Sequence, residues 1–459
     1  GIRDRDVTGV QTCALPIWTF KDREFALMAV KIGIIAEHKP GEGRIPLTPV
    51  QITQLHKENP NLTISVMPSE QRIFLDDEFR STDIPMSQDL ADSNLVMAVK
   101  EIDVKDIHSN QAYLYFSHTI KGQDYNMPML QHILDTGATL LDYELIRDEN
   151  NRRLVFFGRH AGLAGMVNTL WSYGQRLKAL GTDSPFLQIK QAQDYANLEE
   201  INLSLQILGS EISRWMADKP AIVIGVTGYG NVAGGAQEIL ANLPMHEMSA
   251  EELLTADLDA LHGQLIKVVF KESDMFEPID SNTEFELQDY FNHPEKYQAK
   301  FQPYLKKMHM LVNCIYWDTP YPRLVTLEDI KAHYESDKTL MVVGDITCDI
   351  DGAIQFNTGA TLSPDPVYVY DIKSGDQLMG FKGEGPLVMA VDNLPTELPR
   401  EASEAFGEAL IPFVYAMGAC DYSEPFESLD LPAEVKRAVI AHAGKLAPDF
   451  EMLKKYLKA

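Results

Sequence analysis

The sequence predicts an α/β protein of two doubly wound units with a cleft between them, the first unit being discontinuous along the chain. Short apolar runs alternate with helical stretches from Val30 onward, which is typical of parallel sheets. A second series of the same kind begins near Ala221 and carries a glycine-rich turn. Helical sequence follows this second series, so we expect the tail to return and pack on the first unit.

The first unit contains five expected strands, at residues 31–37, 62–68, 93–100, 112–118 and 138–146. A helix over residues 46–58 opens with Thr48 and Pro49, which favour a helix N-cap and first turn. A second helix ends at Gly137. The long helix expected over residues 161–180 begins with small residues that allow close packing.

The second unit contains four expected strands, at residues 221–227, 265–270, 309–317 and 339–346. Their continuous apolar character suits strands that are covered on both faces. Residues 273–305 are rich in aromatic and acidic side chains and are expected to form an insertion of loops and helices. The predicted domains are therefore 28–158, 159–365 and a helical part, 366–459, that returns to the first unit.

The charge balance excludes two classes of partner. The chain has 67 Asp and Glu against 40 Lys and Arg, a net charge of −27. A strongly negative surface repels phosphate backbones and anionic lipids, so neither a nucleic acid nor a membrane is expected as a partner. A run of about 18 apolar residues, which a spanning helix requires, is not found.

The N-terminal sequence differs in character from the rest. Residues 1–27 begin with Gly and look like translated sequencing adaptor, so we expect a non-native extension and a natural start at Met28.

The four cysteines are widely spaced, at Cys13, Cys314, Cys348 and Cys420. This spacing predicts neither a metal site nor a disulfide framework, and it favours a cytoplasmic location. Cys314 and Cys348 stand in apolar runs and are expected to be buried.

A GxGxxA turn follows the first strand of the second unit and opens a helix. Gly228 makes the tight turn, Gly230 lets the backbone approach a pyrophosphate, and Ala233 packs the helix on the strand. The free N–H groups around Asn231 and Val232 favour an anion. The pattern predicts a Rossmann-like site for NAD or NADP, and the alternative is a tight turn without a ligand.

An acid at the end of the next strand would favour NAD, because it would bond the ribose hydroxyls. Glu247 is the candidate, and no arginine that could hold a 2′-phosphate lies nearby.

Polar side chains gather where the strands of the first unit end, at Arg44, Lys100, Glu101, His118, Lys121, Glu144 and Arg153. Lys100 and His118 are expected to form a general acid–base pair. Glu101 and Glu144 would tune their pKa values or hold a cationic substrate. A strand-end lysine or histidine is often merely solvated, and convergence on one edge is what favours the functional interpretation.

Cationic and acidic groups complete the predicted site. Arg44 and Arg153 would anchor substrate carboxylates, with Lys121 close by. Asp345 and Asp349 in the second unit are expected to face the cleft, the alternative being turn capping.

Specific stretches of the chain resemble a known family. They are GRIPLTP, YFSHTIKGQDYNMPML, FFGRHAGLAGM, VTGYGNVAGGAQEI, NHPEKYQAKF, NCIYWDTPYPRLVT and AVDNLPTELPREASEAFGEALIPF. With them the chain resembles the lysine–2-oxoglutarate reductase half of the bifunctional α-aminoadipic semialdehyde synthases. It is more distantly similar to fungal lysine-forming saccharopine dehydrogenase and to alanine dehydrogenase.

The resemblance implies a reaction and its residues. Lysine and 2-oxoglutarate would condense to an imine, which NAD(P)H reduces to saccharopine, with Lys100 and His118 carrying the proton transfers. Asp349 and the loop Asp392-Asn393-Leu394 would lie near the cofactor. The bifunctional enzymes lean toward NADPH and the fungal enzyme toward NAD, so the cofactor stays open.

One position departs from the family pattern. Family members carry an arginine at the end of the first strand, where this chain has Ile35. The change leaves the reaction class intact and leaves open which oxo acid is used. The predicted function is thus an NAD(P)-dependent oxidoreductase of the saccharopine-forming type. The alternatives are an alanine-dehydrogenase-like enzyme and a non-catalytic dinucleotide-binding regulator, and the oligomeric state is open.

Overall fold

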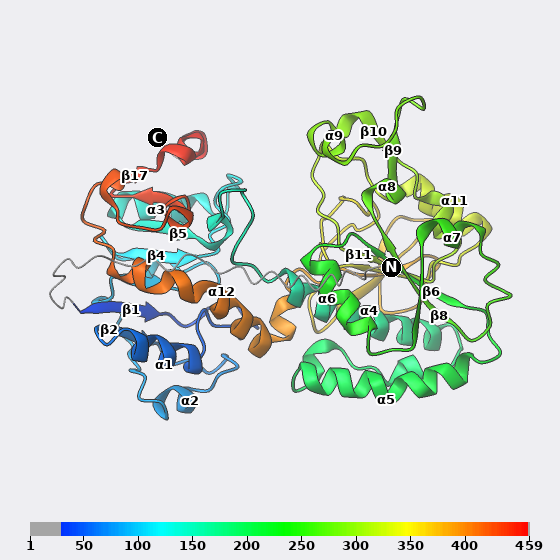
Figure 1. Ribbon diagram of the computed structural model, residues 1–459, viewed down its shortest axis with the longest axis horizontal. Helices are drawn as coiled ribbons and strands as arrows, with labels where there is room; N and C mark the ends of the chain where they lie inside the picture. Colours follow the sequence, from blue (N-terminus) through cyan, green and yellow to red (C-terminus); the bar gives the residue numbers. More distant parts are fainter. Residues whose placement is uncertain (1–28, 458–459) are drawn as a thin grey trace, which may run out of the picture.

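The computed structural model describes residues 29–457, which form two α/β units lying side by side (Figure 1). The first unit builds a seven-stranded sheet and the second an eight-stranded sheet. The predicted α/β fold with two Rossmann-like sheets is therefore confirmed. The expected extension over residues 1–27, with Cys13 and the start at Met28, lies outside the described residues.

The first sheet contains strands from both ends of the chain. Its spatial order is β17 (Lys445–Leu446), β16 (Val439–His442), β5 (Thr139–Asp142), β4 (Ala112–Tyr115), β3 (Leu95–Met97), β1 (Val30–Ile34) and β2 (Leu62–Val66). Strands β1 to β5 are parallel, whereas β16 is antiparallel to β5 and β17. Because β16 and β17 follow the second unit in the sequence, the first unit is discontinuous, as predicted.

The helices of the first unit are α1 (Pro49–Glu58), α2 (Asp76–Arg80), α3 (Met127–Thr136), α12 (Pro399–Ala419) and α13 (Ala433–Lys436). Both predicted helix boundaries are confirmed. The side chain of Thr48 accepts a hydrogen bond at the start of α1, and Gly137 ends α3 in the left-handed conformation at φ 70°. Helix α12, orange in Figure 1, packs on β1 and α1 and so brings the tail back to the first unit.

The second sheet has the order β14 (Gln377–Met379), β13 (Val367–Tyr370), β15 (Leu387–Met389), β12 (Val342–Asp345), β11 (Met310–Asn313), β6 (Ile222–Thr227), β8 (Leu265–Phe270) and β7 (Met245–Met248). The prediction that residues 366–459 are helical and belong to the first unit is wrong at its start. Strands β13 to β15 extend the second sheet, and the chain crosses back only after them. Of these strands β15 pairs with β12, β13 pairs with β15 and β14 pairs with β13, through backbone contacts that a local sequence pattern does not specify.

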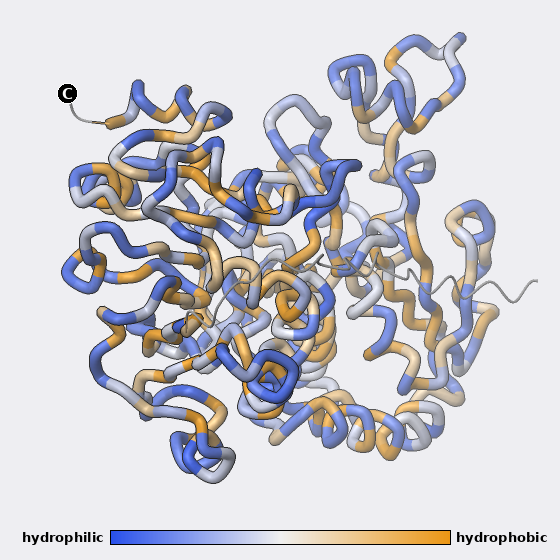
Figure 2. Tube along the Cα trace, turned by 60° about the vertical axis from the view of Figure 1, so that its left-hand side comes forward, coloured by the Kyte–Doolittle hydropathy of each residue, from blue (hydrophilic) through white to orange (hydrophobic). Residues whose placement is uncertain are grey.

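Helices cover both faces of the second sheet. They are α4 (Gly158–Ala179), α5 (Leu198–Met216), α6 (Asn231–Leu240), α7 (Ala250–Thr255), α8 (Glu272–Met275), α9 (Leu287–Asn292), α10 (Gln302–Leu305) and α11 (Leu327–Ser336). One apolar core lies between the sheet and α4, α5 and α6, and another lies under α7, α10 and α11. Figure 2 shows hydrophilic and hydrophobic residues alternating along the outer helices, as this burial requires.

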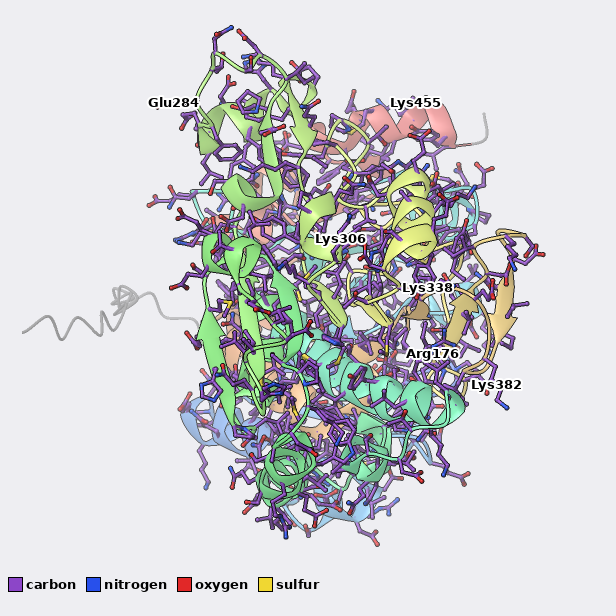
Figure 3. All side chains as sticks on the ribbon, turned by 90° about the vertical axis from the view of Figure 1, so that its right-hand side faces the viewer. Arg176, Glu284, Lys306, Lys338, Lys382 and Lys455 are labelled. Atoms are coloured by element: carbon purple, nitrogen blue, oxygen red, sulfur yellow. The ribbon has the colours of Figure 1, made fainter. Side chains whose placement is uncertain are left out.

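The predicted insertion contains helices α8, α9 and α10, as expected, and also a hairpin that was not expected. Its strands are β9 (Phe276–Pro278) and β10 (Tyr297–Ala299), which pair antiparallel. Glu284, labelled in Figure 3, lies at the outer tip of this insertion. On another part of the unit, Arg176 of α4 donates to the carbonyls of Phe381, Gly383 and Gly385 and so fixes the β13–β14 edge (Figure 3). Within residues 29–457, no helix has both the length and the apolar character needed to cross a bilayer.

Candidate active-site cleft

A cleft of about 1060 Å³ lies between the two units and is lined by residues of both. It brings together most of the predicted site residues, namely Arg44, Lys100, His118, Glu144, Arg153, Gly228, Gly230, Asn231, Val232, Asp392 and Asn393. Because the parallel strands of each unit end at this cleft, polar residues that are distant in sequence converge there.

The glycine turn presents the start of α6 to the cleft. Gly228 has φ +81°, a conformation that favours glycine, and its N–H donates to the Phe270 carbonyl at 2.8 Å. Gly230 is the N-cap of α6, and a Cβ built there would meet no atom within 4 Å. Helix α6 therefore begins at open space with no side chain capping its first N–H groups, which is the arrangement that binds a phosphate.

Two glycines set the position of that helix. A Cβ at Gly162 of α4 would overlap the Val232 carbonyl, and a Cβ at Gly235 of α6 would overlap the Arg159 carbonyl. The two helices thus cross backbone to backbone, as the small residues at the start of α4 predicted. This contact anchors the first turn of α6 on α4 and fixes where its N-terminus points.

His118 is held in the cleft in a conformation that is uncommon for a residue with a side chain. Its φ is +52°, in the left-handed region, and the preceding Ser117 donates its N–H to Asp142 at 2.9 Å. The ring Nδ1 lies 2.5 Å from the Glu101 carboxylate. Burial would raise the pKa of Glu101, but the hydrogen bond with His118 and the charge of Lys100 outweigh it and lower that pKa. Glu101 therefore orients the ring and leaves Nε2 for a substrate.

Lys100 stands beside a partly buried carboxyl, that of Glu37, which sequence reasoning did not assign. Burial lowers the pKa of Lys100, and the positive charge of Arg44 lowers it further. Glu37, which follows β1, accepts hydrogen bonds from the N–H groups of Val99 at 2.5 Å and Lys100 at 3.0 Å. Glu37 thus fixes the backbone of Lys100 in the segment that follows β3. The only sequence signal was an acid directly after a buried strand.

Arg44 is buried and tightly held. Its Nε and Nη2 donate to Glu42 at 2.7 and 2.6 Å, Nη2 also donates to Asn393 at 3.2 Å, and its guanidinium lies 4.1 Å from the Phe157 ring centroid. Burial would raise the pKa of Glu42, but its ion pair with Arg44 keeps that pKa low. The bond to Asn393 ties the first unit to the crossover segment at the cleft.

Arg153 lines the same cleft as Arg44. Arg153 forms a short ion pair with Glu144, and both line the cleft beside the pair of Arg152 and Asp148. The Arg153 side chain is 42% exposed, so it can still meet a substrate. The cleft therefore holds three arginines, a lysine of lowered pKa and an oriented histidine, together with the glycine turn at the start of α6.

Comparison with known proteins identifies the first unit. The family model for the alanine dehydrogenase/PNT N-terminal domain matches residues 33–164. Residues 33–164 of this chain are therefore similar to that domain. The four catalytic or carboxylate-binding candidates that line the cleft, and Glu144 with them, fall within the matched residues.

Curated relatives extend the likeness beyond the alanine dehydrogenase/PNT domain. The chain is 34% identical to the α-aminoadipic semialdehyde synthase of Arabidopsis thaliana over 93% of its own length and 42% of that protein. It is 32% identical to the mitochondrial enzyme of Mus musculus, over 90% of this chain and 46% of the relative. The chain thus spans less than half of these relatives. It is also 26% identical to the NAD(+), L-lysine-forming saccharopine dehydrogenase of Schizosaccharomyces pombe, over 86% of this chain and 95% of that protein. These matches confirm the resemblance seen in the motifs.

Solved structures show the same fold. An L-alanine dehydrogenase superposes with a TM-score of 0.60 at 14% identity, over 93% of this chain and all of that chain. A transhydrogenase from Sinorhizobium meliloti superposes with a TM-score of 0.52 at 15% identity, over 91% of this chain and all of that chain.

Within the matched residues 33–164, Ile35 lies in the core and not in the cleft. It is 6% exposed and packs with the apolar cluster around Leu90 and Leu130. The isoleucine therefore takes no part in lining the cleft, and the arginines that line it are Arg44, Arg152 and Arg153.

Several predicted residues lie outside the lining of the cleft. Leu394 is buried in the core of the second unit, and Lys121 is exposed. Asp345 is 1% exposed and accepts hydrogen bonds from Asn313 and Asn357, so the expectation that it faces the cleft is wrong and the capping alternative is closer. Burial raises the pKa of Asp349 to about 6, with the charges of Asp345 and Lys121 acting in opposite directions.

Glu247 is not positioned as predicted. It lies on the edge strand β7, is 78% exposed and forms an ion pair with Lys267 at 2.7 Å. On the side of β6 away from β11 the neighbouring strand is β8, although β7 comes first in the sequence. The acid at the end of β8 is Glu272, which lines the cleft. Tyr229 of the glycine turn also lines the cleft, and burial and the charge of Glu272 raise the pKa of Tyr229.

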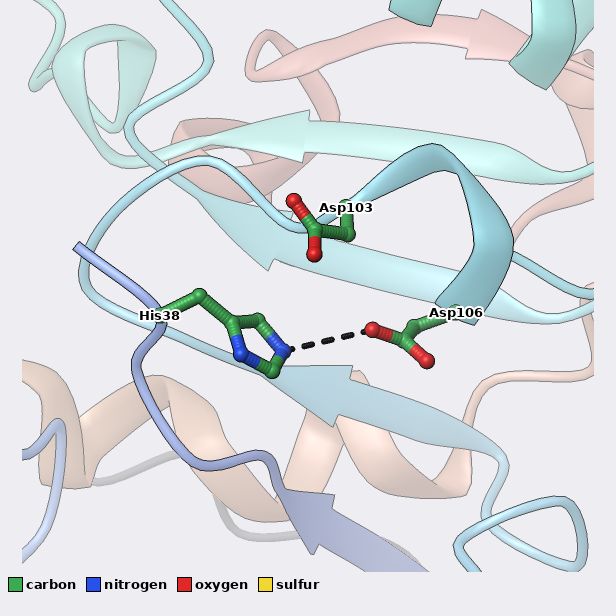
Figure 4. A group of neighbouring side chains, drawn as sticks. All are labelled: His38, Asp103 and Asp106. Carbon is green, nitrogen blue, oxygen red and sulfur yellow. Dashed lines mark ion pairs between the residues drawn. The ribbon is translucent and has the colours of Figure 1, made fainter.

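His38, Asp103 and Asp106 form a group with the spacing of metal ligands (Figure 4). His38 Nε2 lies 3.2 Å from Asp106, and Lys105 lies 3.2 Å from Asp103. These ion pairs explain why the three side chains lie together. His38 and Asp103 are exposed, and Asp106 is partly buried. We assign no metal to this group, and the predicted absence of a metal stays a prediction.

The cysteines among the described residues are free thiols. Cys420 is buried, but Cys314 and Cys348 are only partly buried, so the expectation of full burial is wrong for both. Each follows a strand that ends near the cleft, where the apolar run emerges from the sheet.

Proposed function

We propose that this chain is an NAD(P)-dependent oxidoreductase acting on CH–NH bonds, which interconverts lysine plus 2-oxoglutarate and saccharopine. The observation that carries the proposal is that Lys100 and His118 line the same cleft as the Gly228–Gly230 turn. The names of the relatives, α-aminoadipic semialdehyde synthase and lysine-forming saccharopine dehydrogenase, support this substrate class.

The chemistry needs two groups that move protons. An amine attacks a ketone, a proton reaches the departing oxygen, and another proton leaves the nitrogen as the imine forms. His118 can give or take its proton at Nε2, because Nδ1 is engaged by Glu101. Lys100, whose pKa is lowered by burial, can act as the second group. The nicotinamide cofactor, when bound, supplies the hydride that reduces the imine carbon.

The arginines suit the substrate carboxylates. The hydrogen bonds that the described residues make with Arg44 engage Nε and Nη2, and the pair with Glu144 engages only Nη2 of Arg153. Arg44 therefore keeps only its Nη1 N–H groups for a carboxylate, whereas Arg153 keeps Nε and Nη1. Glu144 and Asp148 could in turn meet the ammonium groups of a lysine-like substrate.

Glu272 favours NAD over NADP. A carboxylate at the end of the strand beside β6 can accept hydrogen bonds from the ribose hydroxyls and repels a 2′-phosphate. Glu272 holds this position and Glu247 does not.

Consumption of NADH or NADPH with 2-oxoglutarate and a panel of amines, lysine first, tests the proposal. We expect lysine-dependent oxidation, and we expect Lys100→Met to lower turnover by about 10²-fold or more while cofactor binding stays intact. Oxidation with pyruvate and ammonia, but not with lysine, would favour an alanine-dehydrogenase-like enzyme, whose fold is shared. Cofactor binding without turnover on any amine would favour a regulator.

The cytoplasmic location stays a prediction. The mammalian relatives are named mitochondrial, so the compartment of the reaction has to be measured in cells.

A further inference from the structure

Asp142 is a fully buried acid beside the cleft, and the proposed mechanism does not use it. It is the last residue of β5 and does not line the cleft. Its backbone is fixed on both sides, because it pairs with Tyr115 of β4 and donates its N–H to the Ala438 carbonyl at 3.0 Å. The carboxylate therefore stands at a fixed point on the edge of the sheet where the strands meet the cleft.

Three donors converge on this carboxylate. Its Oδ2 accepts hydrogen bonds from the Ser117 N–H at 2.9 Å and from the Ser117 hydroxyl at 2.5 Å. Its Oδ1 accepts a hydrogen bond from the Glu144 N–H at 2.8 Å. Ser117 directly precedes His118, and both His118 and Glu144 line the cleft. One buried side chain thus binds the backbone at two of the polar positions of the site.

The backbone at His118 needs this support. His118 has φ +52° and a side chain that is 34% exposed, whereas Ser117 and Thr119 on either side of it are fully buried. The Ser117 and Thr119 hydroxyls lie 2.9 Å apart, and the side-chain amide of Asn126 donates to the His118 carbonyl at 3.3 Å. A left-handed residue with a side chain persists only where the surrounding structure fixes it. Here the fixed points are the two buried neighbours, and Asp142 holds the first of them.

The carboxylate is matched to its donors. Both of its oxygens accept, so it can receive the N–H groups of Ser117 and Glu144 together. An asparagine has the same shape but only one accepting oxygen, so its NH₂ group would face one of these two N–H groups. Because a buried N–H without an acceptor is costly, the loop after β4 or the turn after β5 would have to shift.

We propose that Asp142 is a positioning residue, which fixes the backbone from which His118 enters the cleft and, with it, the backbone of Glu144. The proposal rests on the proposed function, in which His118 moves protons at Nε2. A displacement of about 1 Å at a catalytic group corresponds to about 10²-fold in rate, so Asp142→Asn should lower kcat by roughly tenfold to hundredfold. The Kd of the cofactor should stay unchanged, because the glycine turn belongs to the other sheet.

Turnover with lysine, 2-oxoglutarate and NADH or NADPH, together with NMR of protein that contains isotope-labelled histidine, tests the proposal. In wild type the contact of Nδ1 with Glu101 favours one tautomer of His118, and the loss of its signal in His118→Asn identifies it. In Asp142→Asn this imidazole signal should shift or broaden. Ser117→Ala removes the hydroxyl donor and keeps the N–H donor, so it should have the same effects to a smaller extent. It tests the proposal even if Asp142→Asn does not fold.

Thr139→Val is the matched control. It also breaks a buried hydrogen bond of β5, that of the Thr139 hydroxyl with His442 Nδ1 at 2.7 Å. Thr139 begins the strand that Asp142 ends, so it lies away from the cleft. This variant should unfold at a lower urea concentration than wild type and keep both kcat and the His118 signal.

Wild-type kcat or an unmoved His118 signal in both site variants would overturn the inference, and so would an equal loss in Thr139→Val. The NMR signal does not depend on turnover. A shifted His118 signal in a protein without lysine-dependent activity would support the positioning of the ring and refute the proposed reaction. Unchanged kcat in an active enzyme would refute the positioning role alone.

Discussion

Replacing Glu37 by glutamine should change the stability of this protein in a direction that depends on pH. Burial and the charge of Glu42 raise the pKa of Glu37 to about 8, in spite of the hydrogen bonds from Val99 and Lys100 that lower it. The folded protein therefore holds Glu37 protonated over a range in which the unfolded chain ionises it. Because the folded state binds the extra proton, the stability contributed by this group falls as pH rises from about 4.5 to about 8.

The magnitude follows from the pKa and from the burial of the side chain. Each pKa unit corresponds to about 1.36 kcal/mol, so a rise from 4.5 to about 8 costs at most about 5 kcal/mol at high pH. Glu37 is only partly buried, so water relaxes the cost to about 2–3 kcal/mol. Glutamine lacks this penalty, but it can accept only one of the two N–H bonds well, which costs about 1–2 kcal/mol at every pH.

The variant should therefore be about 1–2 kcal/mol less stable than wild type near pH 5, and equal or slightly more stable near pH 9. Urea unfolding followed by circular dichroism at several pH values measures this difference. Glu42→Gln is the control, because Arg44 keeps the pKa of Glu42 low and its deficit should persist from about pH 5 to about pH 9. A stability difference between Glu37→Gln and wild type that is constant over this range would show that Glu37 is ionised in the folded protein.

Three further perturbations test the site and its support. His118→Asn should lower kcat by about 10²–10⁴-fold with the Kd of the cofactor unchanged, and turnover within a few-fold of wild type would remove His118 from the proton transfers. Gly235→Ala should lower the free energy of unfolding by about 1–3 kcal/mol, because its Cβ overlaps a carbonyl of α4, whereas Gly234→Ala should be neutral or slightly stabilising, because its Cβ meets open space. If the two variants had the same melting temperature, this would contradict the backbone-to-backbone crossing of α4 and α6. Glu272→Ala should raise kcat/KM with NADPH relative to NADH by about tenfold, and Glu247→Ala should leave the ratio unchanged; the reverse result would restore the edge strand as the ribose site.

Features that depend on local chemistry were predictable from the sequence. Thr48 and Pro49 mark the start of α1, and Gly137 marks the end of α3, because capping involves only residues within one turn. The turn at Gly228 was predictable for the same reason. The convergence of Lys100 and His118 followed from the rule that parallel strands end at one edge of a sheet.

Features that depend on which strands pair were not predictable in this way. Apolar runs such as residues 367–370 and 387–389 fit either sheet, and only the ladders of β15 with β12 and of β13 with β15 assign them to the second unit. The ribose acid was misplaced because β8, and not the sequence neighbour β7, lies beside β6.

The sequence by itself thus determined the two α/β units, the phosphate-binding turn and the acid–base candidates, because each of these is encoded within a strand, a turn or a helix end. The tertiary structure alone decided that Glu37 clamps the Lys100 backbone, that Ile35 belongs to the core, and that Glu272 and the aromatic insertion face the turn. These relations are made by segments far apart in the chain, and they are fixed only when the strands have paired and the two units enclose the cleft.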